Sequence, residues 1–201
     1  GVIEISSASL EEIRSELESF KESEKFVVAY GDQYSQGLYY LATIADKVIL
    51  NPQGSISWHG LASTPVFYKD LLEKIGVEMQ VFKVGTYKSA VEPFTSTEMS
   101  DANREQVTRY LTSIWNNMLE DVAISRGIET AALNTLADSL TVMAPAQTSV
   151  EGGLVDTLCY ISDVKNILKE KAEITVDNYI QKGVIPPAKR EVAVNLCLKD
   201  N

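Results

Sequence analysis

Short apolar strand segments that occur in pairs between helices constrain the fold of this 201-residue chain most strongly. Residues 25–30 (KFVVAY) are typical of a strand buried in a parallel sheet, and residues 36–47 follow as a helix. Two more short strands are expected at residues 48–50 and 55–58, on either side of the turn sequence of residues 51–54 (NPQG). Strands that alternate with helices predict an α/β fold, although paired strands differ from a regular doubly wound sheet.

Cap residues and apolar stripes predict the remaining elements. Ser9 and Glu12 form a capping box at the start of the first helix. Pro65 is typical of a helix start and Gly76 of its end, and Leu71 and Ile75 are expected to face inward. Further helices are expected at residues 100–126, 129–140 and 162–171, and a strand at residues 77–84.

The two chain ends suggest a piece of a longer protein. Residues 1–5 (GVIEI) and residues 192–198 (VAVNLCL) both have the composition of strands. Pro186 and Pro187 lie in a stretch, residues 173–191, that is typical of a linker. We therefore predict one domain over residues 1–172, and a linker with the first strand of a further module over residues 173–201.

Composition and charge exclude several classes of function. The net charge is −10, from 18 basic and 28 acidic residues, which disfavours a nucleic-acid partner because phosphate binding needs clustered lysine and arginine. Neither glycine-rich phosphate-loop pattern occurs in the sequence, so no nucleotide cofactor is expected. No apolar run approaches the roughly 20 residues that span a bilayer.

The single histidine, His59, excludes most metal sites and triads. A Ser-His-Asp triad would have to use His59, and a zinc site with two histidines cannot form within one chain. His59 lies beside a turn, so a structural or surface role is favoured. Cys159 and Cys197 lack metal-site spacing and are expected to be buried free thiols, although a disulfide between them stays open.

Residues 84–94 (VGTYKSAVEPF) contain the strongest candidate for chemistry, Lys88. This lysine ends an apolar strand segment, where Gly85 permits close backbone approach. Burial would lower the pKa of the amine, and a neutral amine can act as a base. The simpler interpretation is a surface lysine in a loop, which describes most lysines.

A second candidate is Ser35, in the strand-to-helix turn of residues 34–37 (YSQG). Such turns can present nucleophiles and oxyanion donors, because free N–H groups lie at the start of a helix. We favour a helix cap for Ser35. The carboxylates Asp32, Asp46 and Glu92 form no evident acid–base pair. The aromatic group of Tyr34, Tyr39, Tyr40 and Trp58 is expected to be core or interface rather than a base-stacking platform.

These segments together resemble the bacterial signal peptide peptidase A (protease IV) family. The resemblance is to the N-terminal repeat of its long, two-repeat form, and it covers about residues 9–172. Residues 34–42, residues 51–54, His59-Gly60 and above all residues 84–94 carry it. The resemblance implies a ClpP/crotonase-like fold, a spiral of β-β-α units, and a serine-type endopeptidase with a Ser-Lys dyad and no cofactor or metal.

In this family the catalytic lysine corresponds to Lys88, as general base, and the nucleophilic serine comes from the second repeat. A gapless comparison with the catalytic repeat places Gln36 at the nucleophile's position and Trp58 at that of a second serine that steadies the lysine. An amide cannot accept an acyl group. The resemblance therefore implies that this half has kept the base and lost the nucleophile, and that the chain alone is inactive.

The resemblance also implies partners and a location. Substrates would be apolar signal peptides, the assembly a homotetramer that includes the C-terminal repeat of the same protein, and the location the bacterial inner membrane with the protease on the periplasmic side. The membrane segment would lie outside this chain. Two alternatives remain: a non-catalytic assembly or binding repeat, and a crotonase-like acyl-CoA enzyme.

Overall fold

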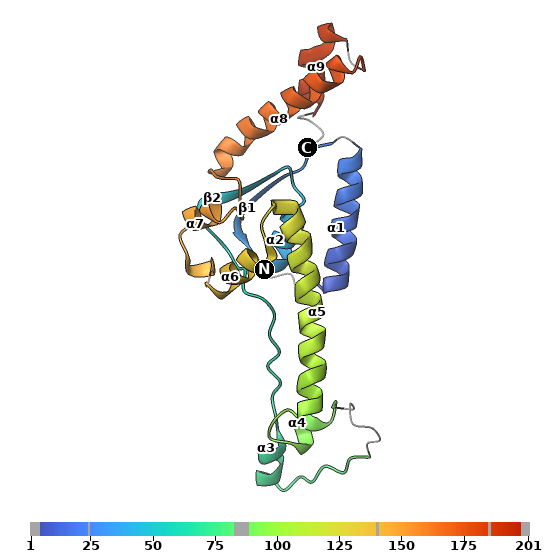
Figure 1. Ribbon diagram of the computed structural model, residues 1–201, viewed down its shortest axis with the longest axis vertical. Coiled ribbons are helices and arrows are strands. Elements are labelled where there is room, and N and C mark those ends of the chain that lie inside the picture. Colours follow the sequence, from blue (N-terminus) through green and yellow to red (C-terminus); the bar gives the residue numbers. More distant parts are fainter. Residues whose placement is uncertain (1–4, 24, 83–88, 140, 185, 198–201) are drawn as a thin grey trace. The chain divides into compact units, whose positions relative to one another are not determined.

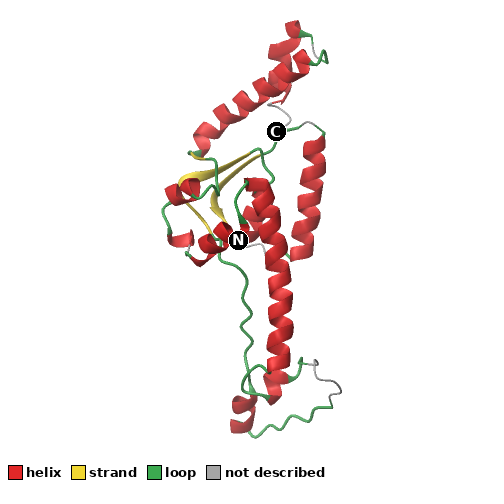
Figure 2. Ribbon diagram, viewed as in Figure 1, coloured by secondary structure: helices red, strands yellow, loops and turns green. Residues whose placement is uncertain are grey.

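A computed structural model describes residues 5–23, 25–82, 89–139, 141–184 and 186–197 of the chain. The described residues form a mixed α/β structure with one small parallel sheet (Figures 1 and 2). In chain order the elements are α1 (Ser7–Glu22), β1 (Val28–Tyr34), α2 (Gln36–Ala42), β2 (Lys47–Ile56), α3 (Lys69–Lys74), α4 (Glu92–Thr95), α5 (Asp101–Arg126), α6 (Thr130–Asp138), η1 (Thr141–Met143), α7 (Ala146–Glu151), β3 (Thr157–Leu158), α8 (Ile161–Gln181), η2 (Pro187–Lys189) and α9 (Arg190–Cys197).

The chain divides into two compact units, and each is described by itself. The first comprises Gly1–His59 and Asp121–Asn201, and it contains the sheet. The second comprises Gly60–Glu120, with α3, α4 and most of α5. The predicted helix over residues 100–126 is confirmed as α5, and Gly127 follows it with a φ of 65°, a conformation that glycine adopts without strain.

The sheet has the order β1-β2-β3, and both pairings are parallel. A parallel pair needs a crossover, and α2 provides the one between β1 and β2. Asp156 helps to hold β3 in place, because its carboxylate accepts hydrogen bonds from the Val48 N–H (2.6 Å) and from Arg126 (2.8 Å). Burial pushes the pKa of Asp156 upward, but these two partners outweigh it and leave the pKa below its usual range.

The sequence prediction was wrong about the turn at residues 51–54. The two strands expected on either side of it are one strand, β2, with an irregularity in the pairing: Gly31 pairs with Leu50, and Gln33 with Ser55. Residues 51–54 are the extra residues of β2 between these two pairs. The Asn51 side chain accepts a hydrogen bond from the Gln53 N–H at 2.9 Å, which closes a local turn there. The NPQG sequence therefore forms a bulge and does not end the strand.

The core of the first unit gathers on the sheet and α2. The predicted aromatic group is confirmed as core, because Tyr34, Tyr39, Tyr40 and Trp58 are all buried. The rings of Tyr39 and Trp58 meet edge to face with centroids 5.6 Å apart. The fully buried aliphatic residues of this core include Val48, Ile49, Leu50, Ile56, Leu133 and Leu154.

Helix α1 begins earlier than the predicted capping box. Its N-cap is Ser6, whose side chain accepts a hydrogen bond from the Ser9 N–H at 3.2 Å. Arg14 is buried on the inner face of α1 and donates to the Tyr40 carbonyl (2.6 Å), to Thr43 (3.0 Å) and to Ser125 (2.6 Å). One buried guanidinium thus joins α1, α2 and the C-terminal end of α5.

The C-terminal segment is more helical than the sequence predicts. Helix α8 continues ten residues beyond the expected end at residue 171, and residues 190–197 form α9 where a strand was expected. Helices α8 and α9 lie side by side (Figure 1). They pack through the small cluster of Ala172, Val176 and Val194, next to Phe26. The strand prediction failed because alternating apolar residues over so short a run also fit one face of a helix.

In the second unit the predicted helix after Pro65 is shorter than expected, and Leu71 and Ile75 are exposed rather than inward. Helix α3 has six residues, and none of them is buried. Residues 77–82, the described part of the predicted strand, have no regular secondary structure.

Within the described part of the chain, no helix is long and apolar enough to cross a membrane.

Candidate functional site

The turn between β1 and α2 is built around the cap residue Ser35. Its backbone is extended (φ −67°, ψ 160°), and its hydroxyl accepts a hydrogen bond from the Leu38 N–H at 3.4 Å. Its carbonyl oxygen accepts the first helical hydrogen bond from the Tyr39 N–H at 2.8 Å. The predicted cap role of Ser35 is confirmed, because its hydroxyl accepts from the start of the helix.

Gln36 is the first residue of α2, and its side chain is buried. Its amide oxygen accepts a hydrogen bond from the backbone N–H of His59 at 3.0 Å. Gln36 therefore connects the start of α2 to the chain that leaves β2, within the first unit. A glutamine amide has no hydroxyl or thiol to deprotonate, so Gln36 makes a structural contact here and cannot itself act as a nucleophile.

Trp58 fills the space next to this turn. It is fully buried, its ring nitrogen donates to the Leu133 carbonyl at 3.0 Å, and its backbone N–H donates to Thr141 at 3.0 Å. The residue after it, His59, is exposed, which agrees with the predicted surface role. An indole buried among aromatic and aliphatic side chains is a core residue and cannot steady a lysine as a serine would.

The other titratable side chains of the first unit are held in separate places. Asp32 accepts hydrogen bonds from Tyr30 (3.0 Å) and Asn51 (2.8 Å), whereas Asp46 pairs with Lys21 at 3.2 Å. Cys159 is a free thiol, half-buried rather than buried as predicted, and burial raises its pKa. A raised pKa leaves less thiolate at neutral pH, so this cysteine is a poor nucleophile.

The buried tyrosines are equally unsuited to act as bases. Burial is the largest cause that raises the pKa of Tyr34, Tyr39 and Tyr40 above the ordinary value. Their phenols therefore stay protonated and donate hydrogen bonds, for example from Tyr39 to the Leu154 carbonyl at 2.8 Å. Among the described residues there is also no cluster of histidine, cysteine and carboxylate side chains that could hold a metal ion.

The principal candidate, Lys88, lies outside the described residues, and description of the second unit resumes at Ser89. The segment after it is firmly held. The Glu92 N–H donates to the Ser89 carbonyl at 3.0 Å, and the Glu92 carboxylate is buried against the N-terminus of α5. The ring of Phe94 stacks on that of Tyr68 with centroids 6.0 Å apart. The lysine segment, residues 84–94, thus ends in an ordered turn over its described residues 89–94.

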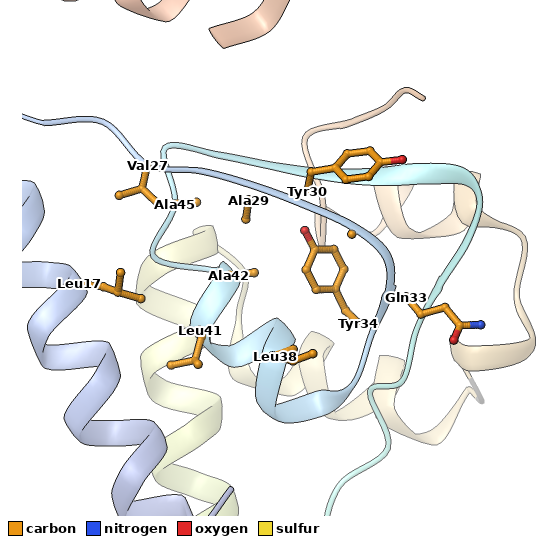
Figure 3. A pocket seen from close by; sticks show the side chains of 11 residues that line it. Leu17, Val27, Ala29, Tyr30, Gln33, Tyr34, Leu38, Leu41, Ala42 and Ala45 are labelled. Atoms are coloured by element: carbon orange, nitrogen blue, oxygen red, sulfur yellow. The ribbon is translucent and has the colours of Figure 1, made fainter. Parts of the chain in front are cut away.

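An open apolar pocket of about 290 Å³ lies between α1, β1 and α2 of the first unit (Figure 3). Figure 3 shows the rings of Tyr30 and Tyr34 near one another. Leu17 of α1 and Leu41 of α2 line the helical side of the pocket. Gly31 leaves room for the Tyr34 ring, because a Cβ atom there would meet the ring at 2.8 Å. Apolar side chains line most of the pocket, which suits an apolar ligand or chain segment.

Comparison with known proteins identifies the family. Residues 19–175 match the family described as peptidase family S49, which is more than three quarters of the chain. The chain belongs to peptidase family S49. The matched span contains Gln36, Trp58 and Lys88. The resemblance to the signal peptide peptidase A family, inferred from the sequence, is confirmed.

Three S49 relatives illustrate the similarity. Protease 4 of Salmonella typhi is 41% identical over 169 residues, which are 81% of this chain and 27% of that protein. Protease 4 of Haemophilus influenzae is 43% identical over 121 residues, 60% of this chain and 20% of that protein. A putative signal peptide peptidase SppA of Enterococcus faecium is 26% identical over 165 residues, 82% of this chain and 47% of that protein. The chain thus spans about a quarter or less of the two proteases.

Two features of this S49 chain were missed by reasoning from the sequence. Glu92 was considered as an acid–base candidate and not as an anchor for the lysine segment; its position eight residues before the α5 cap, Ser100, was the available signal. The apolar pocket was also missed, because its lining comes from three elements whose packing the sequence pattern leaves open.

Proposed function

We propose that this chain is the lysine-bearing N-terminal repeat of a serine-type signal peptide peptidase. In the proposal, Lys88 is the general base of a Ser-Lys dyad, and the nucleophilic serine belongs to a C-terminal repeat of the same, longer protein, called the full-length protein below. The match of residues 19–175 to peptidase family S49 carries the proposal, since that span includes Lys88. The Gln36 side chain, which accepts a hydrogen bond from the His59 N–H, supports the assignment of the nucleophile to the other repeat.

The proposed reaction is hydrolysis of a peptide bond. Neutral Lys88 takes the proton of the serine hydroxyl, and the serine oxygen attacks the peptide carbonyl. Backbone N–H groups stabilise the oxyanion, and the lysine then gives its proton to the leaving amine. Water hydrolyses the acyl-enzyme in a second round of the same proton transfers. The amine must be neutral at working pH, so its pKa has to fall from about 10.4, as burial in an apolar groove would cause.

The wider assembly is part of the same proposal. Residues 1–172 would form one ClpP/crotonase-like repeat, a spiral of β-β-α units, and residues 173–201 would lead toward the second repeat. The full-length protein would form a homotetramer at the inner membrane, face the periplasm and cleave apolar signal peptides. The parallel sheet agrees with an α/β repeat, and the name of the Enterococcus faecium relative, a putative signal peptide peptidase, supports the substrate class. The homotetramer and the location rest on the family resemblance alone.

Two alternatives make different predictions. A non-catalytic assembly repeat would tolerate loss of Lys88, and the buried contacts of Gln36 and Trp58 agree with a structural role for that part of the chain. A crotonase-like acyl-CoA enzyme would bind coenzyme A, which a direct binding measurement detects. The S49 match favours the peptidase over both.

Ser35 provides the test of where the nucleophile lies. In the full-length protein, Ser35→Ala should leave peptidase kcat within about twofold of wild type, since the hydroxyl serves as a cap. The same substitution should lower the free energy of unfolding by about 1 kcal/mol, the usual cost of an N-cap. Enzyme assays and urea unfolding measure the two effects. Loss of turnover in a folded Ser35→Ala variant would place the nucleophile in this chain and overturn the proposal.

A further inference from the structure

The carboxylate of Glu92 is buried in the second unit and engaged by the start of α5. Glu92 is only 4% exposed. One oxygen accepts from the Ser100 hydroxyl at 2.6 Å, and the other accepts from the Ser100 N–H at 3.2 Å and from the Asn103 amide at 2.9 Å. Hydrogen bonds to a charged acceptor are the strong kind, and a negative charge is favoured at a helix N-terminus.

This contact ties together two segments that are separate in the sequence. Ser100 is itself the cap of α5, since its hydroxyl also accepts from the Asn103 N–H at 3.3 Å and its carbonyl accepts from the Arg104 N–H at 2.8 Å. Glu92 therefore anchors the short helix α4 to the end of a 26-residue helix. A long helix is a rigid support for a short turn.

The anchored turn begins directly after Lys88. The Glu92 N–H closes a turn back to the Ser89 carbonyl at 3.0 Å. Pro93 restricts the backbone that follows, and its carbonyl accepts from the Tyr68 N–H at 2.6 Å. Hydrogen bonds thus hold the backbone between Ser89 and Phe94, and the buried Glu92 carboxylate accepts three more from the start of α5.

We propose that Glu92 is a positioning residue for Lys88: it holds the turn of residues 89–92 on the start of α5, and so restrains the chain from which Lys88 reaches the serine hydroxyl. This inference rests on the proposed function. A general base must lie within hydrogen-bond reach of its proton, and a displacement of about 1 Å can cost about a hundredfold in rate. The role differs from that of a core residue, because its effect falls on kcat.

The test compares variants of the full-length protein on an apolar fluorogenic peptide. Glu92→Ala should lower kcat about a hundredfold and leave KM within about threefold, since the substrate contacts stay in place. Glu92→Gln keeps one acceptor oxygen and should lose at most about tenfold. The pH dependence of Lys88 acylation by acetic anhydride, followed by mass spectrometry, should shift toward that of an ordinary lysine in Glu92→Ala.

Matched controls separate position from charge and from folding. Glu98→Gln removes the same charge from an exposed side chain between α4 and α5 and should leave kcat unchanged. Thr95→Val removes a hydrogen bond of α4, from the Thr95 hydroxyl to the Val91 carbonyl at 3.1 Å, but keeps the contacts of the Glu92 carboxylate, so kcat should stay within about twofold of wild type. If Glu92→Ala does not fold, Asn103→Ala decides, because it removes the 2.9 Å contact to the carboxylate and keeps both the glutamate and the Ser100 cap; kcat should fall and KM should stay unchanged.

The outcomes distinguish the inference from the proposed function. A folded Glu92→Ala variant with kcat within twofold of wild type, or with unchanged Lys88 acylation, would overturn the positioning role. If that happens while Lys88→Ala is inactive, the dyad stands and only the role of Glu92 is lost. If Lys88→Ala is fully active, the proposed function fails, and the inference fails with it.

Discussion

Replacement of Lys88 by alanine in the full-length protein is expected to lower kcat for peptide hydrolysis by at least about a thousandfold. General acid–base catalysis contributes about 10²–10⁴-fold, and here one amine would both activate the serine and protonate the leaving group. The fold should survive, because the substitution only shortens one side chain and introduces no new polar group or backbone constraint. Steady-state kinetics, with circular dichroism as a check on folding, measure the effect.

Two controls make the result specific. Lys88→Arg keeps the positive charge but stays protonated at any working pH, so it should be as inactive as the alanine variant. Lys74→Ala removes an exposed lysine of the same unit and should keep full activity. Activity in Lys88→Ala comparable to wild type would mean that the base is another group and that the dyad proposal is wrong.

Replacement of Trp58 by alanine is expected to lower the free energy of unfolding by about 3–5 kcal/mol, the range for a buried large aromatic residue. Trp58 is fully buried, packs edge to face on Tyr39 and donates its ring N–H to the Leu133 carbonyl. The loss combines a cavity with an acceptor that loses its partner. Urea unfolding followed by far-ultraviolet circular dichroism measures it without dependence on tryptophan fluorescence.

Two comparisons identify the source of that loss. Trp58→Phe keeps a ring against Tyr39 and removes the N–H donor, so its cost should be smaller, about 1–3 kcal/mol. Tyr160→Ala removes an aromatic ring that is 53% exposed and should cost less than about 0.5 kcal/mol. A cost below about 1 kcal/mol for Trp58→Ala would contradict the assignment of this residue to the core.

Much of the fold could be predicted because local patterns and burial agree in the first unit. The apolar run before Tyr30, the cap at Ser35 and the continuous apolar residues Val48, Ile49 and Leu50 each specify one kind of element. The bulge at residues 51–54 could not be predicted, because a proline–glycine sequence ends some strands and only bends others. Helix α9 was missed for a similar reason, since eight residues satisfy two periodicities.

For the candidate site, the sequence predicted which residues have structural roles better than it predicted the contacts between them. Ser35 as a cap, Tyr39 as core and an exposed His59 are properties that a local sequence pattern determines. The hydrogen bond from the His59 N–H to Gln36, and the buried Glu92 carboxylate on α5, depend on how distant segments meet. Long-range contacts of polar side chains leave no periodic signal in the sequence, so they required the structure.

The central claim is that this chain supplies the base and another part of the protein supplies the nucleophile. Labelling of the full-length protein with a fluorophosphonate probe, followed by peptide mass spectrometry, tests it most directly. We predict that the modified serine lies outside residues 1–201 and that Lys88→Ala prevents labelling while Ser35→Ala does not. A label on Ser35, or on any other serine of this chain, would contradict the account.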